Sequence, residues 1–279
     1  MSLKNLKVNL HITERCNYRC RYCFAHFGSN RDLPLEDWRR IIDNLSASEM
    51  VSGINFAGGE PMLYPKFPAL IDYAKRSGAA VSLISNGFYL LDERITPPDI
   101  FSKLDTLGIS VDSINEKILV ELGCCNQKSK VLSQENLIAI VKRARALNPR
   151  IRIKLNTVVS KLNVNERLIN IEKFIDVDRW KFLKMKPFRN KNFSNLDLTV
   201  SDEEFERFLT LNERNGGESV PESSLVRAYI IIDNRGNLLD NAGDGHKVVG
   251  NLLEEKFEDV FARYAFDAQL YGSRYSSPR

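Results

Sequence analysis

The stretch CNYRCRYC, residues 16–23, places three cysteines in eight positions, and no further cysteine follows until residue 124. Clustered thiols of this kind hold a structural zinc, form a disulfide, or bind three irons of a [4Fe–4S] cluster and leave the fourth iron open to a small molecule. The choice among these three decides most of what the protein can do, and the rest of the sequence bears on it.

The composition is that of an ordinary globular chain of 279 residues, with 43% hydrophobic and 27% charged residues and a net charge of +4. This charge permits an anionic substrate but is too small to indicate nucleic-acid binding. No apolar run is long enough for a transmembrane helix, and residues 1–13 lack the features of a secretory signal. We therefore expect a cytoplasmic protein without membrane attachment.

Cysteine usage argues against a disulfide framework. In the reducing cytoplasm clustered cysteines are more often metal ligands or catalysts, and the number of cysteines is odd. The five are Cys16, Cys20, Cys23, Cys124 and Cys125. His26 would complete a Cys3His zinc site, but zinc ligands usually come as two separated pairs rather than as one tight cluster. We expect Cys124 and Cys125 to be small buried residues and not a second metal site.

Strand-like and helix-like patterns alternate along the chain. The strand patterns cover residues 7–13, 52–58, 80–87, 106–112, 150–159 and 179–187. The amphipathic helical patterns cover residues 33–47, 65–78, 133–148 and 201–214, and a strand, a turn and a second strand follow at 227–240, with a helix near 254–265. Six strand-then-helix units in series predict a parallel sheet with right-handed crossovers, as either an open doubly wound sheet or a partial barrel.

The faces of the strands favour the barrel. A parallel strand buried on both faces is nearly all apolar, whereas most strands here carry polar residues on one face. These polar residues include Asn9, His11, Thr13, Ser110, Lys154, Asn156, Arg179 and Lys181. Buried, unpaired charges are too costly, so a polar interior implies a lumen filled by water or by a ligand. The alternative places Lys154 and Lys181 on a solvated face.

We therefore predict an α/β fold, a partial (β/α)6 TIM-like barrel with a small C-terminal α/β extension. The barrel core covers residues 1–200 and carries the cysteine loop just beyond its first strand, where the loops of βα units build active sites. Residues 201–279 form the extension, which is expected to cover the barrel mouth and the substrate.

The order Cys-x3-Cys-x2-Cys just after the first strand resembles the signature of the radical S-adenosylmethionine (SAM) enzymes. The sequence AGGEP, residues 57–61, follows the second strand and looks like that superfamily's Gly-Gly-Glu-Pro motif. The resemblance implies that the three cysteines hold a [4Fe–4S] cluster whose open iron chelates SAM. By the same resemblance the residues around SAM are Tyr22, Gly58, Gly59, Glu60, Asn86 and Ser110. The glycines allow close backbone approach, and Glu60 can accept hydrogen bonds from an ammonium group.

Within this superfamily the chain resembles the viperins. The segments that match in order and spacing are VNLHITERCNYRCRYCF, INFAGGEP, LISNG, ISVDS, KLNTVVSKLNV, RWKFLKMKPF, VPES, AYIIID and GSRY. The resemblance implies a radical SAM lyase that converts a nucleoside triphosphate into its 3′-deoxy-3′,4′-didehydro analogue, an antiviral terminator of RNA synthesis. In that reaction a 5′-deoxyadenosyl radical takes the hydrogen from C4′, the 3′-hydroxyl leaves as water, and one electron completes the product. Animal viperins also carry an N-terminal amphipathic helix, so we expect this chain to be the soluble prokaryotic form.

The resemblance also assigns substrate residues. Lys154, Arg179 and Lys181 are the implied triphosphate ligands, which agrees with the inward-facing charges found on the strands. Asn9 and Asn156 are implied polar contacts near SAM and the sugar.

The resemblance also implies one catalytic residue, and the chain differs from animal viperins at two positions of the substrate site. Tyr229 occupies the position of a viperin tyrosine that acts near the substrate radical, with a half-buried strand tyrosine as the plain alternative. The chain departs from animal viperins at two phosphate-binding positions, where Gly53 replaces a lysine and Cys124 replaces an arginine. Lys128 or Lys130 is the expected source of the missing charge.

The expected partners are a nucleoside triphosphate (CTP, UTP or GTP) and an electron donor such as a flavodoxin or a ferredoxin, and a monomer is expected. Two hypotheses compete: a radical SAM enzyme acting on a different small molecule or a peptide, and a zinc-binding protein without catalysis. The sequence contains no C-terminal cysteine-rich region for auxiliary clusters, which argues against a peptide-modifying enzyme.

Overall fold

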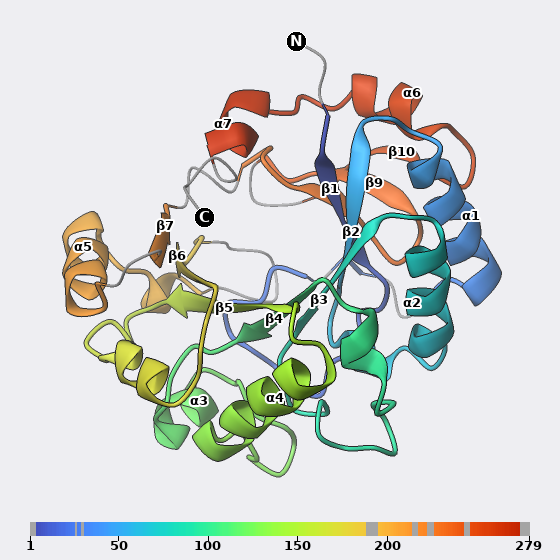
Figure 1. Cartoon of the computed structure of the whole chain (residues 1–279). Coiled ribbons are helices and arrows are strands. Elements are labelled where there is room, and N and C mark those ends of the chain that lie inside the picture. Colours follow the sequence, from blue (N-terminus) through green and yellow to red (C-terminus); the bar gives the residue numbers. More distant parts are fainter. Residues whose placement is uncertain are drawn as a thin grey trace.

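Ten strands form one continuous sheet in the computed structural model, which describes residues 4–25, 27–28, 31–187, 195–213, 217–221, 226–242 and 246–273 (Figure 1). The strands are β1 (Leu6–His11), β2 (Val51–Ala57), β3 (Ala80–Ser85), β4 (Thr106–Ser110), β5 (Arg152–Val159), β6 (Arg179–Lys184), β7 (Gly217–Val220), β8 (Ile230–Ile232), β9 (Asn237–Asp240) and β10 (Lys247–Asn251). The helices are α1 (Leu35–Ser46), α2 (Phe67–Arg76), α3 (Glu116–Glu121), α4 (Gln134–Leu147), α5 (Asp202–Leu211), α6 (Phe257–Ala262) and α7 (Ala268–Ser273). No helix in the described ranges is long and apolar enough to cross a membrane.

The strand order confirms the predicted partial barrel. Strands β1 to β7 lie side by side in chain order, and all of these neighbours are parallel. At the other edge β8 pairs in parallel with β1, and β9 and β10 continue the sheet in antiparallel fashion. Over the described residues β7 and β8 do not pair, so the curved sheet stays open between them. Figure 1 shows helices α1, α2 and α4 along the outside of this curved sheet.

Two of the six predicted strand-then-helix units were wrong in detail. The connections from β3 to β4 and from β5 to β6 carry only short 3₁₀-helices, at Ile100–Lys103 and Leu168–Lys173. Pro97–Pro98 lies in the first connection and disfavours an α-helix there, because proline has no backbone N–H and its ring clashes with the preceding turn. In the second connection the side-chain oxygen of Asn212 accepts hydrogen bonds of 2.7 and 3.2 Å from the first two amides of the 3₁₀-helix.

The apolar face of the strands packs against the helices. In α1 the buried residues Trp38, Ile41 and Leu45 recur at helical spacing and form one apolar face. They belong to the same core as Val8 and Leu10 of β1, which are fully buried. Because successive side chains of a strand point to opposite faces, the polar residues between these positions face the lumen.

The C-terminal residues join this core instead of forming their own. Leu252, Phe257 and Phe261 belong to the hydrophobic cluster that includes the barrel strands. The side-chain amide of Asn44 in α1 donates to the carbonyl oxygens of Leu252 and Glu255, at 2.8 Å each. The extension is therefore attached to the flank of α1 and β1. That it covers the substrate remains a prediction.

Candidate active site

The three cysteines lie on the loop that follows β1, at the carboxyl end of the parallel strands. Two backbone hydrogen bonds tie this loop to the segment after α3. The N–H of Arg19 donates to the oxygen of Gly123 at 3.0 Å, and that of Arg21 donates to the oxygen of Leu122 at 2.9 Å. Backbone hydrogen bonds therefore anchor the cysteine loop to the segment after α3.

Cys16, Cys20 and Cys23 are half-buried and act on one another electrostatically. Burial raises the pKa of Cys16 to about 11 and that of Cys23 to about 12, and the negative charge of Cys20 contributes to both. Metal coordination removes the proton from such a thiol and supplies the missing positive charge. The N–H of Tyr18 donates to Cys16 Sγ at 3.4 Å, and hydrogen bonds to the sulfurs are a known feature of iron–sulfur sites. These residues fit a [4Fe–4S] cluster.

The zinc alternative requires a different arrangement. In the described part of the chain no three His, Cys, Asp or Glu side chains converge on a single ion. A cluster does not require such convergence, because each thiolate binds a different iron. His26, the fourth ligand in the zinc hypothesis, lies outside the described residues.

The glycines of the AGGEP turn pack against the beginning of the cysteine loop. Gly58 has a φ of 148°, and a Cβ on it would lie 2.5 Å from the oxygen of Thr13. A Cβ on Gly59 would lie 2.3 Å from the oxygen of Arg15, so only glycine permits this approach. The close backbone approach expected of these glycines is thus made to the protein's own loop, and their contact with SAM remains a prediction.

Glu60 joins the loop after β2 to the loop after β3. It is fully buried, and its two carboxylate oxygens accept hydrogen bonds from Ser85 Oγ, at 2.9 and 3.0 Å, and from the N–H of Asn86, at 2.9 Å. Burial raises its pKa to about 7 even against these bonds. The side chain of Asn86 in turn donates to Asn17 Oδ1 at 2.9 Å, and its Nδ2 lies 3.8 Å from Cys16 Sγ. Two of the residues expected around SAM therefore lie beside the cysteine loop.

Several buried polar atoms in this region have no hydrogen-bond partner among the described residues, and they include Asn17 Nδ2 and Asn55 Oδ1. Asn55 is in register with Asn9 on the lumen face, and its Nδ2 donates to Asn9 Oδ1 at 2.7 Å. An unsatisfied buried polar atom costs roughly 1–3 kcal/mol, so a donor and an acceptor are left for a bound molecule. The amino, carboxylate and hydroxyl groups of SAM offer both kinds of partner. The sequence did not indicate Asn17 or Asn55, because single asparagines give no pattern.

The register of the sheet lines up the predicted substrate residues on one face. Ser110 of β4 pairs with Asn156 of β5, which pairs with Lys181 of β6, which pairs with Glu218 of β7. Paired residues of neighbouring parallel strands point to the same face, so this row lies on the lumen wall. Glu218 was not expected, because β7 has only four residues and shows no clear period-2 pattern.

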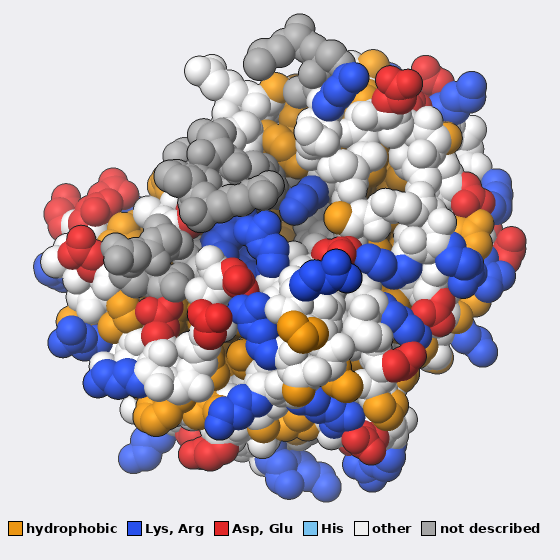
Figure 2. All heavy atoms as spheres, viewed as in Figure 1, with side chains coloured by type: hydrophobic (Ala, Val, Ile, Leu, Met, Phe, Trp, Pro, Cys, Tyr) orange, Lys and Arg blue, Asp and Glu red, His pale blue; other side chains and the backbone are white. Residues whose placement is uncertain are grey.

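Lys181 is 2% exposed, so the hypothesis that it lies on a solvated face is wrong. Its Nζ donates to Glu218 Oε1 at 2.7 Å, and Arg179 Nε donates to Oε2 of the same carboxylate at 2.6 Å. Lys154 is the register partner of Arg179 on the neighbouring strand. The wall thus carries three cations, and the Glu218 carboxylate lies between two of them. Figure 2 shows Lys and Arg side chains gathered in the middle of the visible face.

Asn9 lies on β1, and Tyr229 directly precedes the neighbouring strand β8 at the other side of the sheet. Asn9 is in register with Ile231, and its Nδ2 donates to the oxygen of Ile230 at 3.1 Å. Tyr229 is half-buried just before β8, and its carbonyl oxygen accepts from the hydroxyl of Tyr264 at 3.0 Å. Both predicted residues therefore lie at the pairing of β1 with β8, and the catalytic role of Tyr229 remains a prediction.

Tyr22, a predicted SAM contact, is linked to a buried acid and to a fourth cysteine. Its hydroxyl donates to Asp112 Oδ2 and lies 3.2 Å from Cys124 Sγ. Asp112 lies two residues after the end of β4, and burial raises its pKa to about 6. Cys124 is buried, as predicted, and its Sγ lies 3.5 Å from that of Cys20, whereas Cys125 is half-buried. Sequence reasoning missed the contact between Cys124 and the cysteine loop, since the two are about a hundred positions apart.

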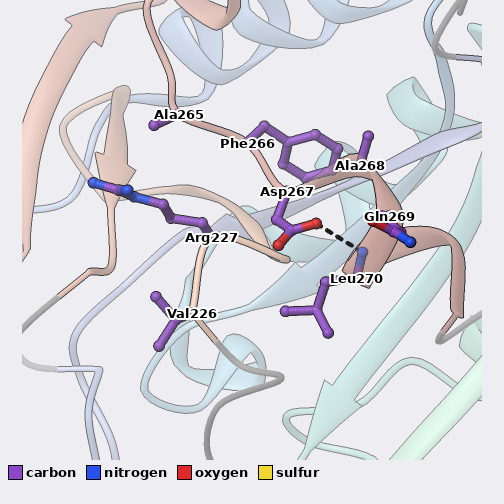
Figure 3. A pocket seen from close by; sticks show the side chains of 8 residues that line it. All are labelled: Val226, Arg227, Ala265, Phe266, Asp267, Ala268, Gln269 and Leu270. Carbon is purple, nitrogen blue, oxygen red and sulfur yellow. Dashed lines mark hydrogen bonds between the residues drawn. The ribbon is translucent and has the colours of Figure 1, made fainter.

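A separate hollow of 690 Å³ lies in the C-terminal part of the chain (Figure 3). Arg227 and Asp267 line it, but Arg227 forms an ion pair of 3.2 Å with Asp240, and Asp267 accepts a bond of 2.8 Å from the N–H of Leu270. Its charged groups are thus paired within the protein. We place the candidate active site at the cysteine loop and the lumen wall.

Comparison with known proteins agrees with this assignment. Residues 10–175 match the family model described as the Radical SAM superfamily. The crystal structure of Streptococcus suis SuiB bound to S-adenosylmethionine has a TM-score of 0.67 at 18% sequence identity, and the match covers 98% of this chain and 68% of SuiB. At this identity the likeness shows the fold.

Closer relatives are known by sequence. A protein of Selenomonas ruminantium named S-adenosylmethionine-dependent nucleotide dehydratase is 50% identical over 270 residues, which are 97% of this chain and 98% of that protein. A protein of the same name from Psychrobacter lutiphocae is 33% identical over 291 residues, with 98% of this chain and 95% of that protein covered. This chain therefore belongs to the radical SAM superfamily and, within it, to the viperin-like family of SAM-dependent nucleotide dehydratases.

Proposed function

We propose that this protein is a radical SAM nucleotide dehydratase that converts a nucleoside triphosphate into its 3′-deoxy-3′,4′-didehydro analogue. The observation that carries the proposal is Lys181, a cation that is 2% exposed on the lumen wall. Arg179 precedes it by two positions on the same face of β6, and Lys154 of β5 is the register partner of Arg179. A polyphosphate is the substrate group that such a row of cations recognises. The relatives' names supply the reaction class.

The cysteine loop holds the cofactors. A [4Fe–4S] cluster on Cys16, Cys20 and Cys23 supplies, when bound, the electron that cleaves SAM to methionine and a 5′-deoxyadenosyl radical. The bond from the N–H of Tyr18 to Cys16 stabilises the negative charge of that sulfur. The unsatisfied amide of Asn17 and the side chain of Asn86 lie at the same loop and orient SAM.

The lumen wall holds the substrate. Lys154, Arg179 and Lys181 bind the phosphates. Asn156, the register partner of Lys181 on β5, contacts the sugar. In the absence of substrate Glu218 is the counter-ion of Arg179 and Lys181. The pairing with Glu218 limits the free-energy cost of keeping Lys181 buried in the free protein. When the triphosphate binds, its phosphates replace Glu218 as the partner of these cations.

Lys7 is our candidate for the charge that Gly53 does not supply. Lys7 and Gly53 are register partners on β1 and β2, and Lys7 Cγ lies 3.3 Å from the position of a Cβ on Gly53. Because Gly53 has no side chain, Lys7 of the neighbouring strand can occupy the space beside it. Lys7 lies on the same face of β1 as Asn9. Lys128 and Lys130, the residues expected from sequence, lie exposed on a turn around Asn126.

The remaining assignments follow from the same site. Removal of the C4′ hydrogen atom and loss of the 3′-hydroxyl as water require one proton and one further electron. We assign the role near the substrate radical to Tyr229, which directly precedes β8, the strand that pairs with β1. The C-terminal extension covers the substrate from the flank of β1. The substrate is CTP, UTP or GTP, the electron donor is a flavodoxin or a ferredoxin, and the enzyme is a cytoplasmic monomer that acts in antiviral defence.

The test is anaerobic incubation of the reconstituted enzyme with SAM, dithionite and each of CTP, UTP, GTP and ATP. We expect one or more of these nucleotides to raise 5′-deoxyadenosine well above the substrate-free background, together with a product that is lighter than the substrate by one water. If none of the four does so, the nucleotide assignment is wrong. A variant with Cys20→Ala is the matched control and should produce no 5′-deoxyadenosine.

A further inference from the structure

Cys124 lies against the cysteine loop, and its thiol is surrounded by polar groups. Its Sγ is 3.5 Å from Cys20 Sγ, 3.2 Å from the hydroxyl of Tyr22 and 3.8 Å from Asp112 Oδ2. The residue is 4% exposed, and its backbone N–H donates to the oxygen of Leu119 at 2.8 Å. The thiol is therefore held in place beside one of the three cluster ligands.

The charges around Cys124 determine where its S–H bond points. Asp112 already accepts from the hydroxyl of Tyr22 and from the N–H of Val158, the latter at 2.7 Å, and both are stronger donors than a thiol. Among the described residues Cys20 Sγ accepts no other hydrogen bond, and this sulfur is anionic when it binds iron. The thiol of Cys124 lies between the Asp112 carboxylate, which already accepts two hydrogen bonds, and the Cys20 thiolate, and it therefore donates to the thiolate. The acceptor is thus the sulfur of Cys20.

We propose that Cys124 is a positioning residue that donates an S–H···S hydrogen bond to Cys20 and thereby raises the reduction potential of the cluster. Hydrogen bonds to the sulfurs stabilise the reduced cluster, which carries one more negative charge than the oxidised form. Nothing in the lumen wall is needed for this effect. The inference rests on the cluster of the superfamily and not on the nature of the substrate.

The test is a potentiometric titration of the reconstituted enzyme without nucleotide, followed by electron paramagnetic resonance of the reduced cluster. Cys124→Ala removes the donor, and we expect the ratio of reduced to oxidised cluster at a fixed potential to fall about tenfold, a shift of about 59 mV for one electron. Cys124→Ser keeps a donor and should stay close to the unmodified protein. Cys125→Ala, at the adjacent half-buried cysteine, is the matched control and should leave the potential unchanged.

Three outcomes would overturn the proposal. Equal potentials for Cys124→Ala, Cys124→Ser and the unmodified protein would mean that Cys124 only packs. Equal shifts in both Cys124 variants and in Cys125→Ala would indicate a change in the loop as a whole. A spectrum that responds to SAM only after Cys124→Ala would identify Cys124 as a fourth iron ligand. Because no nucleotide is present, each of these results leaves the proposed dehydratase activity to its own test.

Discussion

Replacement of Glu218 by glutamine tests whether the lumen wall is built around a buried charge cluster. Glu218 accepts from Lys181 at 2.7 Å and from Arg179 at 2.6 Å, and the exposed fractions of the side chains are 12% for Glu218, 2% for Lys181 and 22% for Arg179. The glutamine has nearly the same shape and can still accept a hydrogen bond. It cannot compensate two cations.

The expected cost follows from the burial of Lys181. Removing one partner of a buried ion pair lowers the free energy of unfolding by about 3–5 kcal/mol, and the residual hydrogen bond places Glu218→Gln at about 3 kcal/mol. For a chain of this size each kcal/mol corresponds to roughly 2 °C or slightly more, so the unfolding midpoint should fall by about 6 °C. Glu255→Gln, which breaks a partly exposed ion pair with Arg263, is the control and should change stability by no more than about 0.5 kcal/mol.

A polyanion should reverse the loss. The assay is thermal unfolding under anaerobic conditions with and without inorganic triphosphate, which cannot react. A ligand at a hundred times its dissociation constant adds about 2.7 kcal/mol, nearly the whole loss. The unmodified protein should gain less, because the anion must first displace the Glu218 carboxylate. An unchanged midpoint in Glu218→Gln, or equal gains from triphosphate in the two proteins, would refute the counter-ion argument.

Three further predictions concern the same site. Lys181→Ala should weaken nucleoside triphosphate binding by about tenfold or more, since hydrogen bonds to charged groups contribute about 1.5–3 kcal/mol, while the iron content stays unchanged; loss of iron would contradict its assigned role. Lys7→Ala should also weaken binding measured by calorimetry, whereas Lys128→Ala should not, and the reverse result would exclude Lys7 from the phosphate site. Glu60 has its pKa raised to about 7 by burial, so the folded protein retains a proton that the unfolded chain releases near pH 4.3. Its contribution to stability is therefore complete below about pH 4 and is lost as the pH rises to 7. The unfolding midpoint of Glu60→Gln should accordingly fall less between pH 5 and pH 8 than that of the unmodified protein, and parallel curves would contradict the raised pKa.

Local patterns were enough to predict the six central strands and the helices α1, α2, α4, α5 and α6. Each has a clear hydrophobic period, as in α1, where Trp38, Ile41 and Leu45 form one face. The elements α3, β7, β10 and α7 were not predicted, because their short sequences show no clear hydrophobic period. They form through pairing with an existing edge or packing on an existing core.

The cysteine spacing and the GGEP turn indicated the chemistry from the sequence, because they resemble the motifs of the radical SAM enzymes. The strand alternation likewise predicted a polar lumen with Lys154, Arg179 and Lys181 on its wall. Only the tertiary structure decided which groups meet there. It placed Glu218 between two of the predicted cations, Lys7 over Gly53, and the thiol of Cys124 against that of Cys20. These contacts depend on strand register and on loops that are distant in the chain, and no local pattern of residues encodes them.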